Sequence, residues 1–236
     1  MMRSKTVQPL HDSGMNTLSV ATSLAARLVP TLVCVAVAAG FSARAQGAPQ
    51  TAPRIVILGD SLTSGRGIGK ALAYPAVLQA RLKENGYNYD VVNAGVSGDT
   101  TAGGRARLDW ALGDGADAAV VELGGNDGLR GVNPDATAAN LSAILDTLAA
   151  KHIPVLLSGM LAPPNLGPDY WDAFRAVFTR LGQRPGVIFD PFFLQGVAAR
   201  PELNQPDRLH PNAEGVKIIV ARMLPLMQQL VAQVPQ

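Results

Sequence analysis

The sequence predicts a three-layer α/β/α sandwich built on a five-stranded parallel sheet, and two observations lead to this prediction. Five short runs rich in Val, Ile and Leu are continuously apolar rather than alternating, which is typical of strands covered on both faces. The segments between these runs carry apolar residues at helical spacing. Because neighbouring parallel strands need a crossover, which is usually a helix, this alternation indicates one α/β domain.

The expected elements follow one another regularly along the chain. The five strands are RIVILG (54–59), YDVVNAG (89–95), AAVVELGG (118–125), IPVLLSGM (153–160) and GVIFD (186–190). Pro134 and Asp135 suit the start of a helix whose apolar face is formed by Leu141, Ile144, Leu145 and Leu148. A long final helix is expected from Asn212. With 236 residues, 47% of them hydrophobic, the chain has the size and the core of a single domain.

The first 45 residues predict a cleaved secretory signal rather than part of the fold. Basic residues precede an apolar run at 28–41, and Ala-Arg-Ala at 43–45 suits a cleavage site. The run has about 14 residues, whereas a membrane-spanning helix needs about 20, so no stable membrane span is expected. Met15 is an alternative start that would shorten the leader. The mature domain is expected to be 46–236, periplasmic or secreted.

The charge and cysteine content of the expected mature domain exclude several classes of function. Without the leader the chain has 16 basic and 17 acidic residues and no run of Lys or Arg, which disfavours nucleic acid as a partner. The single cysteine, Cys34, lies inside the leader. The mature domain therefore has no thiol nucleophile, disulfide or cysteine ligand, and no metal or cofactor is expected.

Polar turns follow the first three expected strands, at 59–65, 93–100 and 124–128. Because the carboxyl ends of parallel strands meet at one edge of a sheet, these turns predict a site there.

A phosphate-binding loop in 57–70 is the alternative interpretation of the first turn, since this stretch is glycine-rich and contains Lys70. The required glycine and hydroxyl positions hold Ser64 and Ala71, however, and the dinucleotide-binding spacing of glycines also fails.

Ser61, at the end of the first strand, is the candidate nucleophile. A serine needs a base to take its proton, and histidine suits that role because its pKa lies near neutrality. After the leader only His152 and His210 remain, and His152 is expected at the amino edge of the sheet, away from Ser61. Asp207, three residues before His210, could orient its ring, although a solvated turn before the last helix would give the same spacing.

The other two turns offer hydrogen-bond donors for the oxyanion of acyl transfer. Gly98 can present its backbone N–H without a side chain in the way, Asn126 can present its amide, and Ser61 its own N–H. The alternative for Asn126 and Asp127 is ordinary turn chemistry in a glycine-rich segment. The combination with Ser61 and His210 favours a catalytic site.

Four blocks of the sequence resemble the GDSL, or SGNH, hydrolase family. They are GDSL with Ser61, NAGVSGDT with Gly98, GGND with Asn126, and DRLHP with Asp207 and His210. The segments VELGGNDGLRG (121–131) and LAPPNLGPDYWDAF (161–174) are similar to its bacterial periplasmic subgroup of arylesterases, acyl-CoA thioesterases and lysophospholipases. The G-x-S-x-G elbow of α/β-hydrolases is absent because Thr63 replaces its second glycine, so that fold is not expected.

The resemblance implies a flavodoxin-like SGNH hydrolase fold and a Ser61–His210–Asp207 triad. It further implies that Ser61, Gly98 and Asn126 surround the oxyanion, with Asp60 and Asp127 holding their turns by hydrogen bonds. The implied function is hydrolysis of aryl esters, acyl-CoA thioesters and lysophospholipids through an acyl-serine intermediate.

Substrate choice and assembly are less determined by the sequence. Apolar residues of the later loops could line an acyl groove, namely Leu161, Pro163, Leu166, Tyr170 and Phe192. A carbohydrate or peptidoglycan O-deacetylase of the same family, with a polar pocket, is the alternative activity, and a non-catalytic binding module is the alternative class. A small-molecule ester or thioester is the expected partner, and the protein is expected to be a monomer.

Overall fold

Five parallel strands form one sheet with the spatial order β2-β1-β3-β4-β5. The structure is a computed structural model that describes residues 52–235, so the predicted signal at 1–45 lies outside the described residues. The strands are β1 (Arg54–Gly59), β2 (Asp90–Gly95), β3 (Ala118–Glu122), β4 (Val155–Ser158) and β5 (Val187–Asp190). The predicted five-stranded parallel sheet is confirmed.

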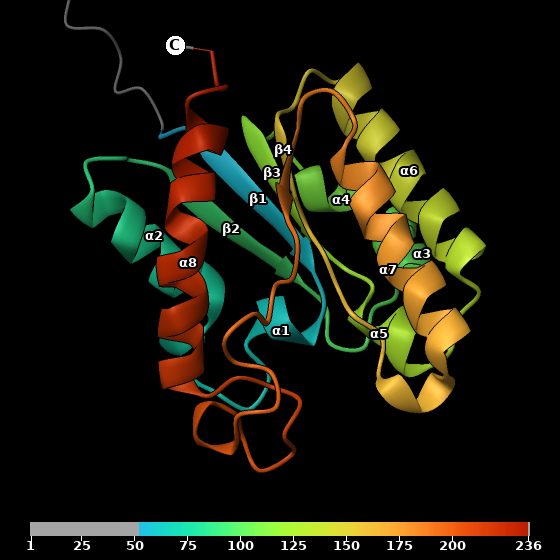
Figure 1. The fold of residues 1–236 in the computed structure, drawn as a ribbon. Helices are drawn as coiled ribbons and strands as arrows, with labels where there is room; N and C mark the ends of the chain where they lie inside the picture. Colours follow the sequence, from blue (N-terminus) through green and yellow to red (C-terminus); the bar gives the residue numbers. More distant parts are fainter. Residues whose placement is uncertain (1–51, 236) are drawn as a thin grey trace, which may run out of the picture. The chain divides into compact units, whose positions relative to one another are not determined.

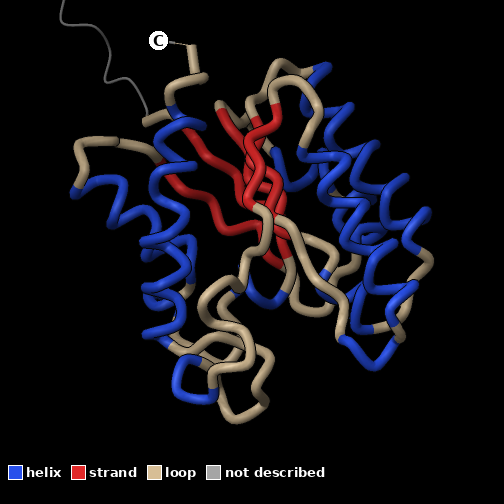
Figure 2. Tube along the Cα trace, viewed as in Figure 1, coloured by secondary structure: helices blue, strands red, loops and turns tan. Residues whose placement is uncertain are grey.

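Helices cover both faces of this sheet, which gives the expected three layers (Figure 1; Figure 2). One face carries α2 (Tyr74–Glu84) and α8 (Ala213–Val231). The other carries α3 (Thr101–Ala106), α4 (Leu108–Leu112), α6 (Pro134–Ala150) and α7 (Pro168–Gly182). The inner strands are fully buried at residues such as Ile57, Val120 and Leu156, because helices cover them on both faces, whereas the edge strand β2 is mostly partly exposed.

The two long helices begin where the sequence supplies a cap. Asn133 accepts the N–H of Asp135 with Pro134 in the first turn, and Asn212 accepts two N–H groups at the start of α8. The predicted apolar face of α6 is buried, including Leu141 and Leu148. Pro225 lies within α8 without ending it. Of the helices in residues 52–235, none combines the length and apolar character that crossing a membrane would require.

The order of the strands determines where in the sheet a site can form. After β1 the chain forms β2 on one side and then returns to form β3 on the other, so Gly59 at the end of β1 lies opposite both Gly95 and Glu122. Such a switch leaves a crevice beyond the carboxyl ends of the strands. Two short helices begin at this edge, α1 (Ser61–Ser64) after β1 and α5 (Gly125–Leu129) after β3 (Figure 1).

Candidate active site

Ser61 is the first residue of α1, directly beyond the end of β1. Asp60 precedes it and accepts the N–H of Leu62 at 2.9 Å, which fixes the start of this one-turn helix. Gly65 ends the turn with a φ of 75°, a left-handed conformation that glycine adopts without strain. The tight turn therefore holds Ser61 at the carboxyl edge of the sheet.

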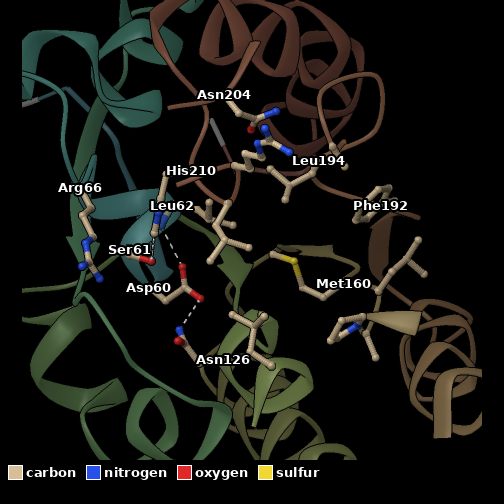
Figure 3. A pocket seen from close by; sticks show the side chains of 18 of the residues that line it. Asp60, Ser61, Leu62, Arg66, Asn126, Met160, Phe192, Leu194, Asn204 and His210 are labelled. Carbon is tan, nitrogen blue, oxygen red and sulfur yellow. Dashed lines mark hydrogen bonds between the residues drawn. The ribbon is translucent and has the colours of Figure 1, made fainter. Parts of the chain in front are cut away.

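His210 and Asp207 meet Ser61 from a loop almost 150 positions later in the chain. His210 Nε2 lies 2.8 Å from Ser61 Oγ, and His210 Nδ1 lies 2.6 Å from Asp207 Oδ2 (Figure 3). The other oxygen of Asp207 accepts the N–H groups of Leu209 and His210, both at 3.0 Å. The structure thus brings together the three residues that the sequence singled out.

Asp207 is held in its ionised form by its own loop. The backbone N–H groups of His210 and Leu209, followed by the His210 side chain, lower the pKa of Asp207 to about 2. An anionic Asp207 accepts the Nδ1 proton of His210, so Nε2 is left as the acceptor that faces Ser61 Oγ. This is the tautomer that a general base needs.

Gly98 and Asn126 also lie at the pocket around Ser61. Gly98 has a φ of 87°, its carbonyl accepts from the Arg130 guanidinium at 3.0 Å, and the space where a Cβ would lie is open except for that guanidinium at 3.8 Å. The N–H of Ser61 lies at the helix start, where it has no partner within the helix. Asn126 is placed differently, because its Nδ2 already donates to Asp60 Oδ2 at 2.9 Å and to the Asp99 carbonyl at 2.8 Å.

The two predicted supporting residues hold their turns through buried hydrogen bonds. Burial raises the pKa of Asp60 to about 6, against the opposing effect of its Leu62 and Asn126 donors. Asp127 accepts the N–H of Thr101 at 2.8 Å and its hydroxyl at 2.5 Å, which ties α5 to the start of α3.

Two polar residues of the site, the half-buried Arg107 and the fully buried Glu122, are absent from the sequence-based prediction. Arg107 donates to the carbonyls of Gly59 and Ala94, each at 2.8 Å, and so links the ends of β1 and β2. Glu122 ends β3, is fully buried, and accepts the hydroxyl of Thr63 in α1 at 2.5 Å. An acidic residue closing an apolar run is the sequence signal that points to Glu122.

A pocket of about 370 Å³ opens beside Ser61 and is lined largely by apolar side chains. Leu161, Pro163 and Phe192 line it as expected, together with Met160 and Leu194, which were not predicted (Figure 3). Two further expectations for the acyl groove, Leu166 and Tyr170, are not among its lining residues.

Leu166 and Tyr170 have other positions for clear physical reasons. Leu166 ends a short 3₁₀ turn (Pro164–Leu166) and is 36% exposed. The Tyr170 hydroxyl donates to the Val132 carbonyl at 2.8 Å, and its ring stacks on Phe174 with the centroids 5.8 Å apart. Tyr170 is therefore a packing residue of α7 rather than a groove residue.

A serine hydroxyl paired with a histidine and an ionised aspartate, at the strand ends of an α/β sheet, is the arrangement of a serine hydrolase. The chain belongs to the GDSL-like Lipase/Acylhydrolase family, whose model matches residues 57–218. Membership makes the chain a carboxylic ester hydrolase, and the expected family is confirmed.

Named relatives and solved structures agree with this family. Esterase TesA of Pseudomonas aeruginosa is 39% identical over 78% of this chain and 91% of its own length. Thioesterase 1/protease 1/lysophospholipase L1 of Escherichia coli K12 is 38% identical, covering 76% and 86%. A crystal structure of TesA superposes with a TM-score of 0.71 at 38% identity, covering 75% of this chain and 99% of that one. The SGNH-hydrolase family esterase AlinE4 gives 0.65 at 43% identity, covering 77% and 98%.

Proposed function

We propose that Ser61, His210 and Asp207 hydrolyse acyl esters and thioesters through an acyl-serine intermediate. The observation that carries the proposal is the 2.8 Å contact between His210 Nε2 and Ser61 Oγ, with Asp207 on the other ring nitrogen. His210 takes the Ser61 proton as Oγ attacks the carbonyl, and then gives that proton to the leaving alcohol or thiol. Water, activated by His210, attacks the acyl-serine and releases the acid.

The oxyanion is stabilised by the N–H groups of Ser61 and Gly98 in this proposal, with Asn126 as the third donor. Both amide hydrogens of Asn126 are engaged by Asp60 and Asp99 in the structure. Asn126 must therefore exchange one of these bonds for the oxyanion when the carbonyl carbon becomes tetrahedral. A bond made only at that stage stabilises the transition state more than the bound substrate.

The apolar pocket favours substrates that carry an acyl chain. Its lining by Leu161, Phe192 and Met160 suits hydrocarbon, whereas an O-deacetylase of glycans would need polar partners for sugar hydroxyls. The relatives are named esterase, arylesterase, thioesterase and lysophospholipase. Aryl esters, acyl-CoA thioesters and lysophospholipids are accordingly the proposed substrate classes.

The direct test is Ser61→Ala assayed with a p-nitrophenyl ester. Loss of the nucleophile should remove nearly all turnover, because no other group in the proposed mechanism can form the acyl intermediate. Circular dichroism should show the same fold, since the substitution removes one oxygen atom. A variant that kept most of the wild-type activity would contradict the proposal.

We propose that the enzyme acts outside the cytoplasm, in the periplasm or secreted, as a monomer without its first 45 residues. The leader pattern at 1–45 supports export, but these residues lie outside the described part of the structure. Amino-terminal sequencing of the exported protein should begin at Gln46, and size-exclusion chromatography should report one chain. A mature start well beyond residue 46, or a dimer, would contradict these points.

A further inference from the structure

Two arginines line the pocket mouth without a role in the mechanism above. Arg66 follows α1, and Arg208 lies between Asp207 and His210. Both are exposed, and within residues 52–235 neither guanidinium forms an ion pair. Arg107, by contrast, is engaged by Asp99. Two uncompensated positive charges therefore stand at the entrance to the site.

Gln205 fixes the two arginine-bearing loops to each other. Its Nε2 donates to the Arg66 carbonyl at 2.8 Å and to the Pro211 carbonyl at 3.0 Å, while its backbone N–H donates to the His210 carbonyl at 2.8 Å. A Cβ at Gly67 would lie 2.0 Å from Gln205 Oε1, so any side chain there would displace the Gln205 amide that joins the loops. The backbones at Arg66 and Arg208 are thus held in a fixed relation to His210.

Arg208 occupies its position at the expense of backbone strain. Its φ is 60°, in the left-handed region where glycine is free and a residue with a Cβ is disfavoured. His152 and Ala199 share this conformation in the described part of the chain, but Arg208 is the arginine among the three and lines the pocket. Here the side chain supplies a positive charge two residues from the proposed general base.

Arg66 lies away from the apolar part of the pocket, and Arg208 belongs to the loop that carries the general base. Figure 3 shows Arg66 on the side of Ser61 opposite to Met160 and Phe192, which belong to the apolar part of the pocket. Arg208 shares a loop with His210, which hands its proton to the departing oxygen or sulfur in the proposed mechanism. With the acyl chain in the apolar pocket, the leaving group would extend from Ser61 toward the side on which Arg66 lies.

We propose that Arg66 and Arg208 form an anion-recognition rim that favours esters and thioesters whose leaving alcohol or thiol carries a negative charge. This inference rests on the proposed function, because it assigns part of the same site. Phosphate, carboxylate and sulfonate groups share the required chemistry, and arginine matches the planar spread of their oxygens. The rim raises kcat/KM for anionic leaving groups by attraction across a solvated distance, so the effect weakens with salt.

The test compares two butyryl esters with the same acyl chain and nearly the same leaving group. One releases 4-hydroxybenzenesulfonate and the other releases neutral 4-hydroxybenzenesulfonamide. The measured quantity is the ratio of kcat/KM for the anionic ester to that for the neutral ester. Comparing this ratio between wild type and variants cancels the intrinsic reactivity difference between the esters.

Arg66→Gln and Arg208→Gly should each lower the ratio by up to about fivefold, the upper end for an exposed charge pair, and the double variant should lower it further. Raising the salt concentration should lower the wild-type ratio toward that of the double variant. Arg208→Gly should fold with an undiminished Tm, because glycine adopts the φ of 60° without strain. Arg180→Gln is the matched control, since it removes an exposed charge from the last turn of α7, near the amino edge of the sheet, and should leave the ratio unchanged.

Equal ratios in the wild type and the double variant, with the neutral ester still hydrolysed, would overturn the rim and leave the proposed function intact. A wild type that hydrolyses neither ester would overturn the proposed function and the rim together. A fall in the ratio that Arg180→Gln reproduces would also overturn the rim, because it would reflect overall charge rather than the two arginines.

Discussion

Asn126 Nδ2 donates to Asp60 Oδ2 across 2.9 Å and thereby joins the turn after β3 to the turn that carries Ser61. The same nitrogen donates to the Asp99 carbonyl in the turn after β2. One amide therefore connects the three strand ends that build the site. The oxyanion donor of the proposed mechanism is also the cross-link that keeps the nucleophile and the Gly98 loop in register.

Replacing Asn126 by alanine should lower kcat by about 10²–10³, the usual cost of losing one oxyanion donor. KM should change little, because the bond to the oxyanion forms only as the carbonyl becomes tetrahedral. Asn88→Ala, at an exposed position before β2, is the control and should keep both constants. Steady-state kinetics on a p-nitrophenyl ester decides the matter, and an Asn126→Ala enzyme with wild-type kcat would exclude Asn126 from the oxyanion site.

Asp60 makes stability depend on pH, and the direction follows from its raised pKa. The folded protein binds the Asp60 proton up to about pH 6, whereas an aspartate exposed in the unfolded chain has a pKa near 3.8 and releases it there. The free energy of unfolding therefore includes a contribution that is present below pH 3.8 and is lost as the pH rises through about 6. Asp60→Asn should show a smaller fall in stability between pH 5 and pH 7, as measured by urea unfolding at each pH. An unaltered pH dependence would mean that the folded protein does not retain this proton.

Glu122 should behave as a neutral side chain at pH 7. Full burial, followed by the charge of Asp60, raises its pKa well above the usual range, and the Thr63 hydroxyl only partly opposes this. Glu122→Gln keeps a neutral acceptor for Thr63 and should change the free energy of unfolding by less than about 1 kcal/mol. Glu122→Ala leaves Thr63 without its acceptor and opens a cavity, which should cost about 2–4 kcal/mol.

Equal losses of stability in the two Glu122 variants would contradict a protonated Glu122. Activity measurements separate a disturbance of the site from a loss of overall stability. Thr63, which bonds to Glu122, belongs to the helical turn that begins with Ser61, so losing this bond should disturb the nucleophile. Glu122→Ala should lower kcat at temperatures where the variant remains folded, and Glu122→Gln should retain most of it.

Phe192 should set part of the preference for acyl-chain length. It lines the apolar pocket, so Phe192→Ala removes area that a long acyl chain covers but an acetyl group does not reach. In a series of p-nitrophenyl esters, kcat/KM should fall more for octanoate than for acetate. Leu166→Ala, outside the pocket lining, is the control and should leave the profile unchanged. A parallel fall across the whole series would indicate that Phe192 only supports the loop.

The sheet and the convergence of the site follow from features that a sequence records directly. Continuous apolar runs predict buried parallel strands, and the carboxyl ends of such strands meet at one edge, which is why Ser61, Gly98 and Asn126 could be grouped before their distances were known. The strand pattern does not assign Asp207 and His210 to the same site. They are assigned to it because Ser61 needs a general base. Their contact through 2.6 and 2.8 Å bonds depends on a loop path that no local pattern encodes.

The sequence pattern does not predict the direction in which a side chain points, or which hydrogen bonds that side chain already makes within the fold. Leu166 and Tyr170 belong to the same segment as Leu161 and Pro163, yet the turn at 164–166 and the start of α7 direct them elsewhere. The double engagement of Asn126 depends on three loops at once. The uncompensated charge at Arg208 likewise emerges only when its neighbours in space are known.

Labelling with a fluorophosphonate decides whether Ser61 is the nucleophile, because such a probe reacts with a serine only when a base and an oxyanion site activate its hydroxyl. We expect one adduct per chain, located on Ser61 by tandem mass spectrometry, and none in Ser61→Ala. Loss of esterase activity should follow the extent of labelling. An unlabelled wild-type protein, or an adduct on another residue with Ser61 unmodified, would contradict the assignment of Ser61 as the nucleophile.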